Sequence, residues 1–237
     1  MSAGNRKRQP KTRESHAAAS RTPRRRSVPR SSRAAALPRD FYARDTEVVA
    51  RDLLGCILEC RSDRGVASGR IVETEAYLGE EDLACHAAAG RTRRTAPLYG
   101  PPGTAYVYFI YGVHWCFNAV TREQGQPSAV LVRALEPLEG VDLMWRRRPA
   151  ARRAPDLTNG PGKLCAALGI DVRHNELRLD RDPIRIREGA SVPRDRVVVT
   201  PRIGITESAE LPLRWFIAAN PYVSRTPASF PRFTPDR

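Results

Sequence analysis

Charge and aromatic residues are distributed unevenly along this 237-residue chain, and the distribution limits where a folded core can form. Residues 1–36 contain eleven Lys and Arg side chains, a single acidic residue, Glu14, and no Phe, Tyr or Trp. Such a segment buries too little apolar surface to offset the entropy lost on ordering it. We therefore expect a disordered basic tail over 1–36, a folded domain over 37–225 and a flexible C-terminal tail over 226–237.

The basic tail accounts for most of the net charge of +14. A cationic arm of this kind raises non-specific affinity for polyanions, most strongly at low salt. The sequence therefore points toward a nucleic-acid partner. A dispensable N-terminal extension remains the alternative, because chain termini tolerate change.

The composition also argues against several classes of protein. No apolar run approaches the roughly 18 residues that a membrane-spanning helix needs, and the N-terminus has no apolar core of a secretory signal. The cysteines are odd in number, which argues against a disulfide framework. Two of the five, Cys56 and Cys60, are closely spaced but lack the second ligand pair of a structural zinc site. We expect a cytoplasmic, nucleoid-associated protein.

Apolar periodicity and turn residues in 37–225 predict a single α+β domain. Asp45 begins a helix that Gly55 ends, and Gly112 forms the tip of a tight hairpin between strands over 106–111 and 113–118. The other predicted elements are a hairpin of strands over 56–59 and 66–77, a buried strand over 129–135, helices over 139–148 and 164–168, and short strands near Leu177, Ile184, Val197 and Trp215.

The segment 71–77 reads Ile-Val-Glu-Thr-Glu-Ala-Tyr. Side chains alternate along a strand, so Glu73, Glu75 and Tyr77 share one face. Two acids and a phenol on one surface suit acid–base chemistry. A solvated strand face is the simpler interpretation of this segment taken alone.

Tyrosines recur over 106–111, where Tyr106 and Tyr108 share a strand face. Tyr111 stands at the Gly112 turn, and we expect its side chain to be exposed. An exposed aromatic tip suits stacking against a nucleobase. Ordinary packing within a sheet is the alternative for the tyrosine row.

The segment 158–163 reads Thr-Asn-Gly-Pro-Gly-Lys and precedes a predicted helix. Backbone amides at such a helix entry, together with Lys163, can bind an anion. The segment is not a P-loop, because no Ser or Thr follows the lysine. A plain helix start is the competing interpretation. Three further residues, His86 and the strand-end residues Asn118 and Arg133, carry no signal on their own.

These segments occur in one order along the chain: 70–79, His86, 103–112, 116–118, 131–137 and 160–165. In that order they resemble the alkyladenine/3-methyladenine DNA glycosylase family, the monofunctional type that removes alkylated and deaminated purines. The resemblance implies a compact α+β domain around a curved antiparallel sheet with a protruding DNA-intercalating hairpin. It also implies a monomer that acts on double-stranded DNA containing damaged purines, with no membrane, metal or other cofactor.

The resemblance assigns the chemistry to Glu75, which would deprotonate the water that attacks the sugar. A general base must be ionised, so we expect a cation beside it. Arg133 matches the arginine of the family's active site and supplies that cation. Glu73 would be a neighbouring carboxylate without this role.

The same resemblance assigns substrate binding to aromatic side chains. Tyr77 would stack on one side of the flipped base, with His86 and Tyr108 on the other side and Tyr106 fixing His86 by a hydrogen bond. Electron-rich rings favour the cationic purines that alkylation produces. Asn118 would exclude normal guanine by colliding with its exocyclic amine.

The remaining assignments concern the DNA. Tyr111 would wedge into the space that the flipped nucleotide leaves, while Gly160, Gly162 and Lys163 would contact phosphates. Two rival hypotheses stay open at this point. One is a bifunctional glycosylase/lyase that uses Lys163 as a Schiff-base nucleophile, and the other is a basic nucleic-acid-binding protein without activity.

Overall fold

The computed structural model describes residues 1–2 and 35–229. The basic tail expected over 1–36 therefore lies outside the described residues, apart from 1–2 and 35–36. The end of the expected C-terminal tail, 230–237, lies outside them as well. Within the described part, the α+β fold predicted from the sequence is confirmed.

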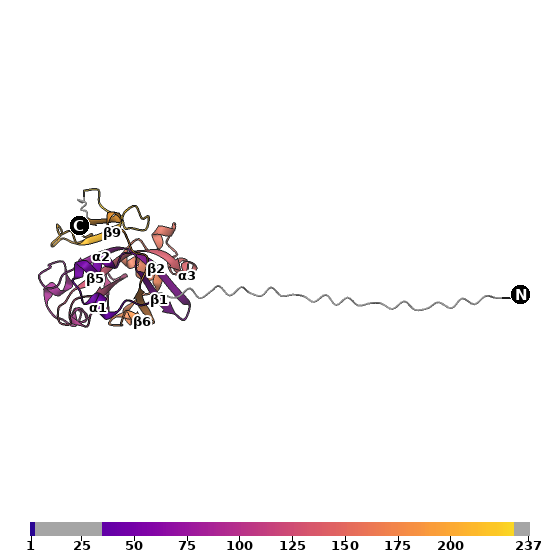
Figure 1. Cartoon of the computed structure of the whole chain (residues 1–237), viewed down its shortest axis with the longest axis horizontal. Coiled ribbons are helices and arrows are strands. Elements are labelled where there is room, and N and C mark those ends of the chain that lie inside the picture. Colours follow the sequence, from indigo (N-terminus) through magenta and orange to yellow (C-terminus); the bar gives the residue numbers. More distant parts are fainter. Residues whose placement is uncertain (3–34, 230–237) are drawn as a thin grey trace. The chain divides into compact units, whose positions relative to one another are not determined.

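A curled antiparallel sheet forms the framework of the fold (Figure 1). Its main path runs β3-β4-β5-β2-β1-β7-β6, and β9 joins it by pairing with both β2 and β8. The long strands β2 and β5 pair with each other at its centre. The strands are β1 Ile57–Ser62, β2 Gly65–Tyr77, β3 Ala105–Ile110, β4 His114–Val120, β5 Ala129–Glu139, β6 Asp180–Arg181, β7 Ile184–Arg187, β8 Val197–Thr200 and β9 Arg214–Ile217.

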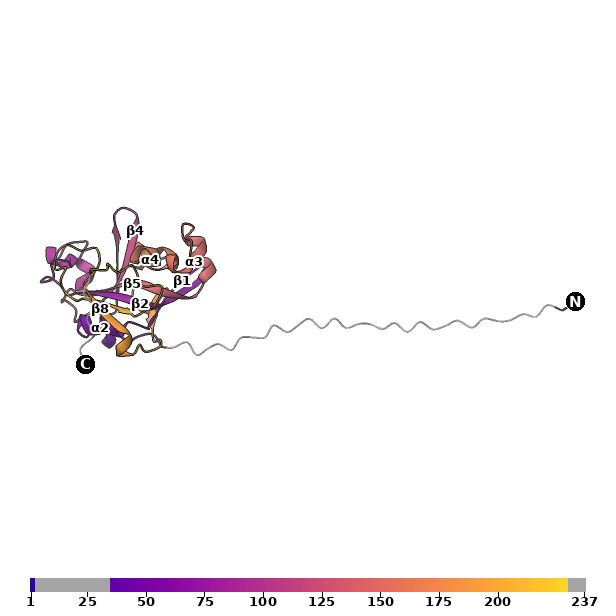
Figure 2. The same cartoon turned by 90° about the horizontal axis from the view of Figure 1, so that it is seen from above.

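Short helices cover this sheet. Helix α2 packs against β2, β5 and β9, and α4 packs against β4, β5 and α3. Figure 2 shows α2 and α4 on opposite sides of the central strands. The helices are α1 Arg39–Tyr42, α2 Thr46–Asp52, α3 Val141–Arg147 and α4 Pro161–Leu168, with 3-10 turns η1 His86–Ala89, η2 Ala96–Tyr99, η3 Ala154–Leu157, η4 Val172–His174 and η5 Arg194–Arg196.

The main elements follow the sequence prediction. The carboxylate of Asp45 caps α2 by accepting from the backbone N–H of Glu47 at 3.0 Å. Strands β1 and β2 pair as a hairpin around 63–64, and β3 and β4 pair as a second hairpin whose turn contains Gly112. The buried strand over 129–135 is present and continues to Glu139.

Four details of the prediction are wrong. Glu139 ends β5, and α3 begins only at Val141, because Gly140 adopts a left-handed φ of 72° and breaks the strand from the helix. Leu177 is not in a strand, since its N–H closes the turn of η4. Helix α4 begins at Pro161, whose missing N–H costs nothing in a first turn. Neither Arg133 nor Asn118 stands at a strand end, since Arg133 lies within β5 and Asn118 within β4.

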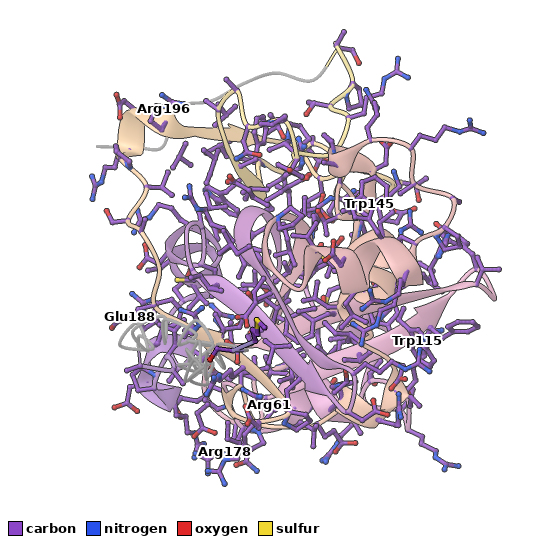
Figure 3. All side chains as sticks on the ribbon, turned by 90° about the vertical axis from the view of Figure 1, so that its right-hand side faces the viewer. Arg61, Trp115, Trp145, Arg178, Glu188 and Arg196 are labelled. Atoms are coloured by element: carbon purple, nitrogen blue, oxygen red, sulfur yellow. The ribbon has the colours of Figure 1, made fainter. Side chains whose placement is uncertain are left out.

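The hairpin of β3 and β4 extends away from the rest of the sheet in Figure 2. Its outer surface carries Phe109 and Trp115, whose ring centroids are 4.7 Å apart. Trp115 lies at the periphery of the molecule in Figure 3. The opposite side of the same two strands carries Tyr106, Tyr108 and Asn118, and this side faces the cavity described next.

Candidate active site

A cavity of about 570 Å³ opens between the β3–β4 hairpin, the ends of β2 and β5, the start of α4 and residues 203–205. This volume is in the usual range for small-molecule sites. All but one of the predicted site residues line the cavity: Tyr77, His86, Tyr106, Tyr108, Tyr111, Asn118, Arg133, Gly160, Gly162 and Lys163. The exception, Glu75, accepts hydrogen bonds from three residues that line the cavity, Arg133, Tyr77 and Ile203.

Glu75 is fully buried in the middle of this arrangement. Its Oε2 accepts from Nη1 of Arg133 and from the hydroxyl of Tyr77, each at 3.0 Å. Its Oε1 accepts from the backbone N–H of Ile203 at 2.8 Å. The solvated strand face that the segment alone suggested is therefore wrong, because later parts of the chain cover it.

Glu73 lies beside Glu75 and is equally buried. Its Oε1 accepts from Arg214 Nε at 2.7 Å, from Arg133 Nε at 3.2 Å and from Ser224 Oγ at 2.7 Å. Its Oε2 accepts from the Ser224 N–H at 2.7 Å. Burial alone would raise the pKa of Glu73, but the two guanidinium groups and Ser224 lower it below its ordinary value.

The two carboxylates differ in where their hydrogen-bond partners lie. The three donors to Glu75 all belong to residues that line the cavity. Of the residues that donate to Glu73, only Arg133 lines it, whereas Arg214 and Ser224 do not. Glu75 is therefore the carboxylate next to the cavity. Strand parity could not separate them.

Arg133 joins the two carboxylates and borders the cavity. Burial would lower the pKa of its guanidinium, but Glu75 and Glu73 raise it well above the ordinary value. The side chain is therefore a permanent cation. It donates a hydrogen bond to Glu75 and fixes the orientation of that carboxylate from one side.

A cluster of aromatic rings lines another part of the cavity. Nδ1 of His86 lies 2.9 Å from the hydroxyl of Tyr106, and its ring centroid lies 4.5 Å from that of Tyr108. Burial, together with the charge of Arg94, lowers the pKa of His86 below its ordinary value. The imidazole is consequently neutral at pH 7 and does not repel a cationic ligand.

Tyr77 and Asn118 complete the lining, and both are held by the fold. The hydroxyl of Tyr77 is tied to Glu75. The side-chain amide of Asn118 is buried and donates to the carbonyl of Tyr106 at 3.0 Å across the β3–β4 pair. Both side chains border the cavity in fixed orientations.

The tip of the hairpin contains an unusual backbone. Tyr111 adopts a φ of 54° and Gly112 a φ of 67°, and the N–H of Val113 bonds the carbonyl of Ile110. Two consecutive positive φ angles define a tight hairpin turn that normally takes Asn-Gly. A bulky residue in the first position is strained. The Tyr111 side chain is 81% exposed.

The start of α4 lies close to the tip of this hairpin, at His114, the first residue of β4. A Cβ on Gly162 would come within 2.8 Å of the His114 ring, so the close approach requires glycine. The amine of Lys163 donates to Oδ1 of Asn159 at 2.7 Å. Lys163 therefore borders the cavity as a tethered cation.

Comparison with protein families gives a match over residues 40–221 to the model described as methylpurine-DNA glycosylase. The chain belongs to the methylpurine-DNA glycosylase family. It is accordingly a DNA glycosylase, a hydrolase of the DNA-repair type. Membership favours the enzyme over the rival hypothesis of a binding protein without activity.

Curated relatives of this glycosylase are similar over most of its length. A Koribacter versatilis protein is 48% identical over 83% of this chain and 98% of its own. Proteins of Methanoculleus marisnigri and Carboxydothermus hydrogenoformans are 49% and 46% identical, each over 80% of this chain and 98% of their own. All three are provisionally named 3-methyladenine DNA glycosylases.

Several residues around the glycosylase site had no signal in the sequence. Ile203, Arg214 and Ser224 reach the two carboxylates from 128 to 151 residues further along the chain. Asp82 and Arg202 form a further buried ion pair next to Tyr77. Only the fold brings these residues together.

Three other features of the described part of the glycosylase bear on the sequence analysis. The five cysteines are free and buried. Within 1–2 and 35–229, no group of three or more metal-ligating side chains comes together. Over the same residues, no helix has the length and apolar character needed to cross a membrane.

Proposed function

We propose that this glycosylase flips an alkylated purine out of duplex DNA and hydrolyses its N-glycosidic bond. The substrates would include 3-methyladenine and 7-methylguanine, with deaminated and etheno purines as candidates for wider specificity. The names of the relatives support the first of these. The observation that carries the proposal is the buried Glu75 carboxylate, whose three hydrogen-bond donors all belong to residues that line the aromatic cavity.

In the proposed reaction, Glu75 binds a water molecule and takes its proton as the oxygen attacks C1′ of the flipped nucleotide. The bond between C1′ and the water oxygen forms while the C1′–N bond breaks. The bonding electron pair leaves with the base. Arg133 places a positive charge beside Glu75 and holds the orientation of the carboxylate.

An alkylated purine suits this site because it is cationic. The departing electron pair neutralises the ring, so 3-methyladenine or 7-methylguanine leaves without a general acid. A neutral base such as hypoxanthine needs protonation. Tyr77, Tyr108 and the neutral His86 offer ring faces to a cation, each contact worth about 0.5–2 kcal/mol.

The rigidity of Asn118 supports a role in excluding normal guanine. Its amide is buried and bonded to the opposite strand, so it cannot swing aside for an exocyclic amine. A purine without that amine, such as 3-methyladenine, fits without this penalty, whereas 7-methylguanine keeps the amine and has to offset the penalty through its positive charge. The proposed discrimination is therefore steric, with an unpaired polar group as the penalty for guanine.

The hairpin tip supports a role in base flipping. Tyr111 is exposed and is held in a strained backbone conformation above the cavity. Inserting its ring into the duplex would replace part of the stacking lost when the nucleotide flips, which is a few kcal/mol. Gly160, Gly162 and Lys163 would hold a flanking phosphate, and the enzyme would act as a monomer.

Because Lys163 borders the cavity, one alternative mechanism stays open, in which the enzyme is a bifunctional glycosylase/lyase. In that scheme the amine of Lys163 would attack C1′ and form a Schiff base with the sugar. The amine is bonded to Asn159, which favours a role in phosphate binding over nucleophilic attack.

Release of free base from a methylated duplex, followed by chromatography in the presence of EDTA, tests the proposal. We expect 3-methyladenine and 7-methylguanine to be released and undamaged purines to be retained. The same assay on a duplex that contains hypoxanthine measures whether a neutral, deaminated purine is also released. Tight binding without release from any of these duplexes would contradict the proposed function.

A further inference from the structure

Asp82 and Arg202 form an ion pair that takes no part in the catalytic arrangement described above. The guanidinium donates to both oxygens of Asp82, Nη1 to Oδ2 at 2.5 Å and Nη2 to Oδ1 at 2.8 Å. The two residues are only 3% and 1% exposed. Two-point pairing of this kind fixes the relative orientation of both groups.

The pair is also bonded to the backbone around it. Arg202 donates to the carbonyls of Ala76 and Ser208, and Asp82 accepts from the N–H groups of Leu78 and Ala84. Burial would raise the pKa of Asp82, but the hydrogen bonds from Arg202 and the backbone lower it below its ordinary value. Both members of the pair are therefore charged at neutral pH.

The guanidinium of Arg202 lies directly over the ring of Tyr77, with its central carbon 4.7 Å from the ring centroid. Tyr77 borders the cavity, and Arg202 does not. The guanidinium therefore covers the face of the ring that is turned away from the cavity. The other face remains for the flipped base.

This position matters for a cationic substrate. A bare positive charge behind the ring would draw electron density from it and repel a cation stacked in front of it. The carboxylate of Asp82 cancels that charge at the distance of a direct hydrogen bond. A neutral base would be much less sensitive to the charge behind the ring.

We propose that Asp82 is a specificity-determining residue, which neutralises Arg202 behind Tyr77 and so allows a cationic purine to stack on the open face of that ring. The inference rests on the proposed function, because it assumes that the damaged base occupies the cavity. It adds a source of preference for charged lesions that lies outside the cavity lining.

The test compares two bases of nearly equal shape and different charge. Duplexes carry either 3-methyladenine or its neutral isostere 3-deaza-3-methyladenine, at pH 8, and all proteins also carry Glu75→Gln to prevent release. The measured quantity is the ratio of the two dissociation constants, cationic over neutral. Asp82→Asn should raise this ratio at least about fivefold.

Two further variants make the charge effect distinct from a packing effect. Arg202→Gln leaves the carboxylate alone behind the ring and should lower the ratio. The double variant Asp82→Asn/Arg202→Gln removes both charges and should return the ratio to within about twofold of the parent. If one single variant does not fold, as judged by circular dichroism, the direction given by the other decides.

Arg185→Gln is the matched control. Arg185 also forms a buried pair, with its Nη2 2.6 Å from Oε1 of Glu59, but neither residue borders the cavity. Its loss should leave the ratio unchanged.

An unchanged ratio of dissociation constants in folded Asp82 and Arg202 variants would overturn the inference. An equal loss of affinity for both duplexes is such a result. The proposed function is checked separately by the wild-type chain, which should release 3-methyladenine from the first duplex. Absence of release with a shifted ratio would contradict the function and leave the charge effect standing.

Discussion

Arg133 and Glu75 form a buried ion pair, with Nη1 of the arginine 3.0 Å from Oε2 of the glutamate. The same guanidinium reaches Glu73 through Nε at 3.2 Å. One cation therefore serves two neighbouring carboxylates that have different surroundings. All three donors to Glu75 line the cavity, whereas Arg214 and Ser224, which donate to Glu73, do not.

The first prediction concerns the stability that Glu73 provides. Its pKa in the folded protein is below the ordinary value of 4.5, so on acidification the unfolded chain takes up the proton first. The stabilisation is complete above about pH 4.5 and is lost as the pH falls below it. Glu73→Gln should lower the free energy of unfolding by about 3 kcal/mol at pH 7.

Urea unfolding at pH 7 and pH 3.5 checks this prediction, with Glu136→Gln as the control. Glu136 is partly exposed and lies 3.7 Å from Arg70. Its loss should change stability by less than about 1 kcal/mol. Equal effects of the two substitutions at pH 7 would show that the Glu73 network contributes no special stability.

A second prediction follows from the backbone of Tyr111. Tyr111→Asn places a residue suited to positive φ in the turn and should stabilise the protein by about 1 kcal/mol, seen as a higher Tm. The same change should slow release of base from duplex DNA, because the wedge is lost. Val113→Thr alters an exposed neighbour in the same turn and should do neither. A Tyr111 variant that is less stable or fully active would contradict this account.

Asn118→Ala gives a third prediction. Removing the amide should relieve the collision with the exocyclic amine and raise the release of undamaged guanine, relative to 3-methyladenine, by about tenfold or more. The measurement is the ratio of single-turnover rates on the two duplexes. If guanine stays excluded, the discrimination has another source.

The fourth prediction separates the two enzyme mechanisms. Sodium borohydride added during turnover should trap no covalent complex, since the amine of Lys163 is bonded to Asn159 and, in the proposed function, contacts a phosphate. Lys163→Ala should instead weaken duplex binding and reduce its salt dependence by about one unit of slope. A trapped adduct that disappears in Lys163→Ala would establish the lyase.

The sequence was most informative where structure is local. The alternation around Glu75 and the Gly112 turn placed β2 and the β3–β4 hairpin correctly, because strand parity and turn geometry depend on neighbouring residues. The local pattern was misleading at Glu139, which was predicted to begin a helix and is instead the last residue of β5.

The burial of the two carboxylates was beyond reach of the sequence pattern. In the sequence, Glu73 and Glu75 have the pattern of an exposed strand face. In the folded protein that face is covered by the last part of the domain, which contributes Ile203, Arg214 and Ser224. Such contacts are set by tertiary packing and leave no periodic signal. Family resemblance could propose roles for the lining residues, but the pair behind Tyr77 emerged only from the structure.

The most direct test of the account is single-turnover release of 3-methyladenine by the wild type and by Glu75→Gln, with duplex affinity measured for both. Because only the group that activates water is altered, we predict that release falls by about 10²–10⁴-fold and that affinity for the damaged duplex changes little. Release by Glu75→Gln at the wild-type rate would contradict the assignment of Glu75 as the base.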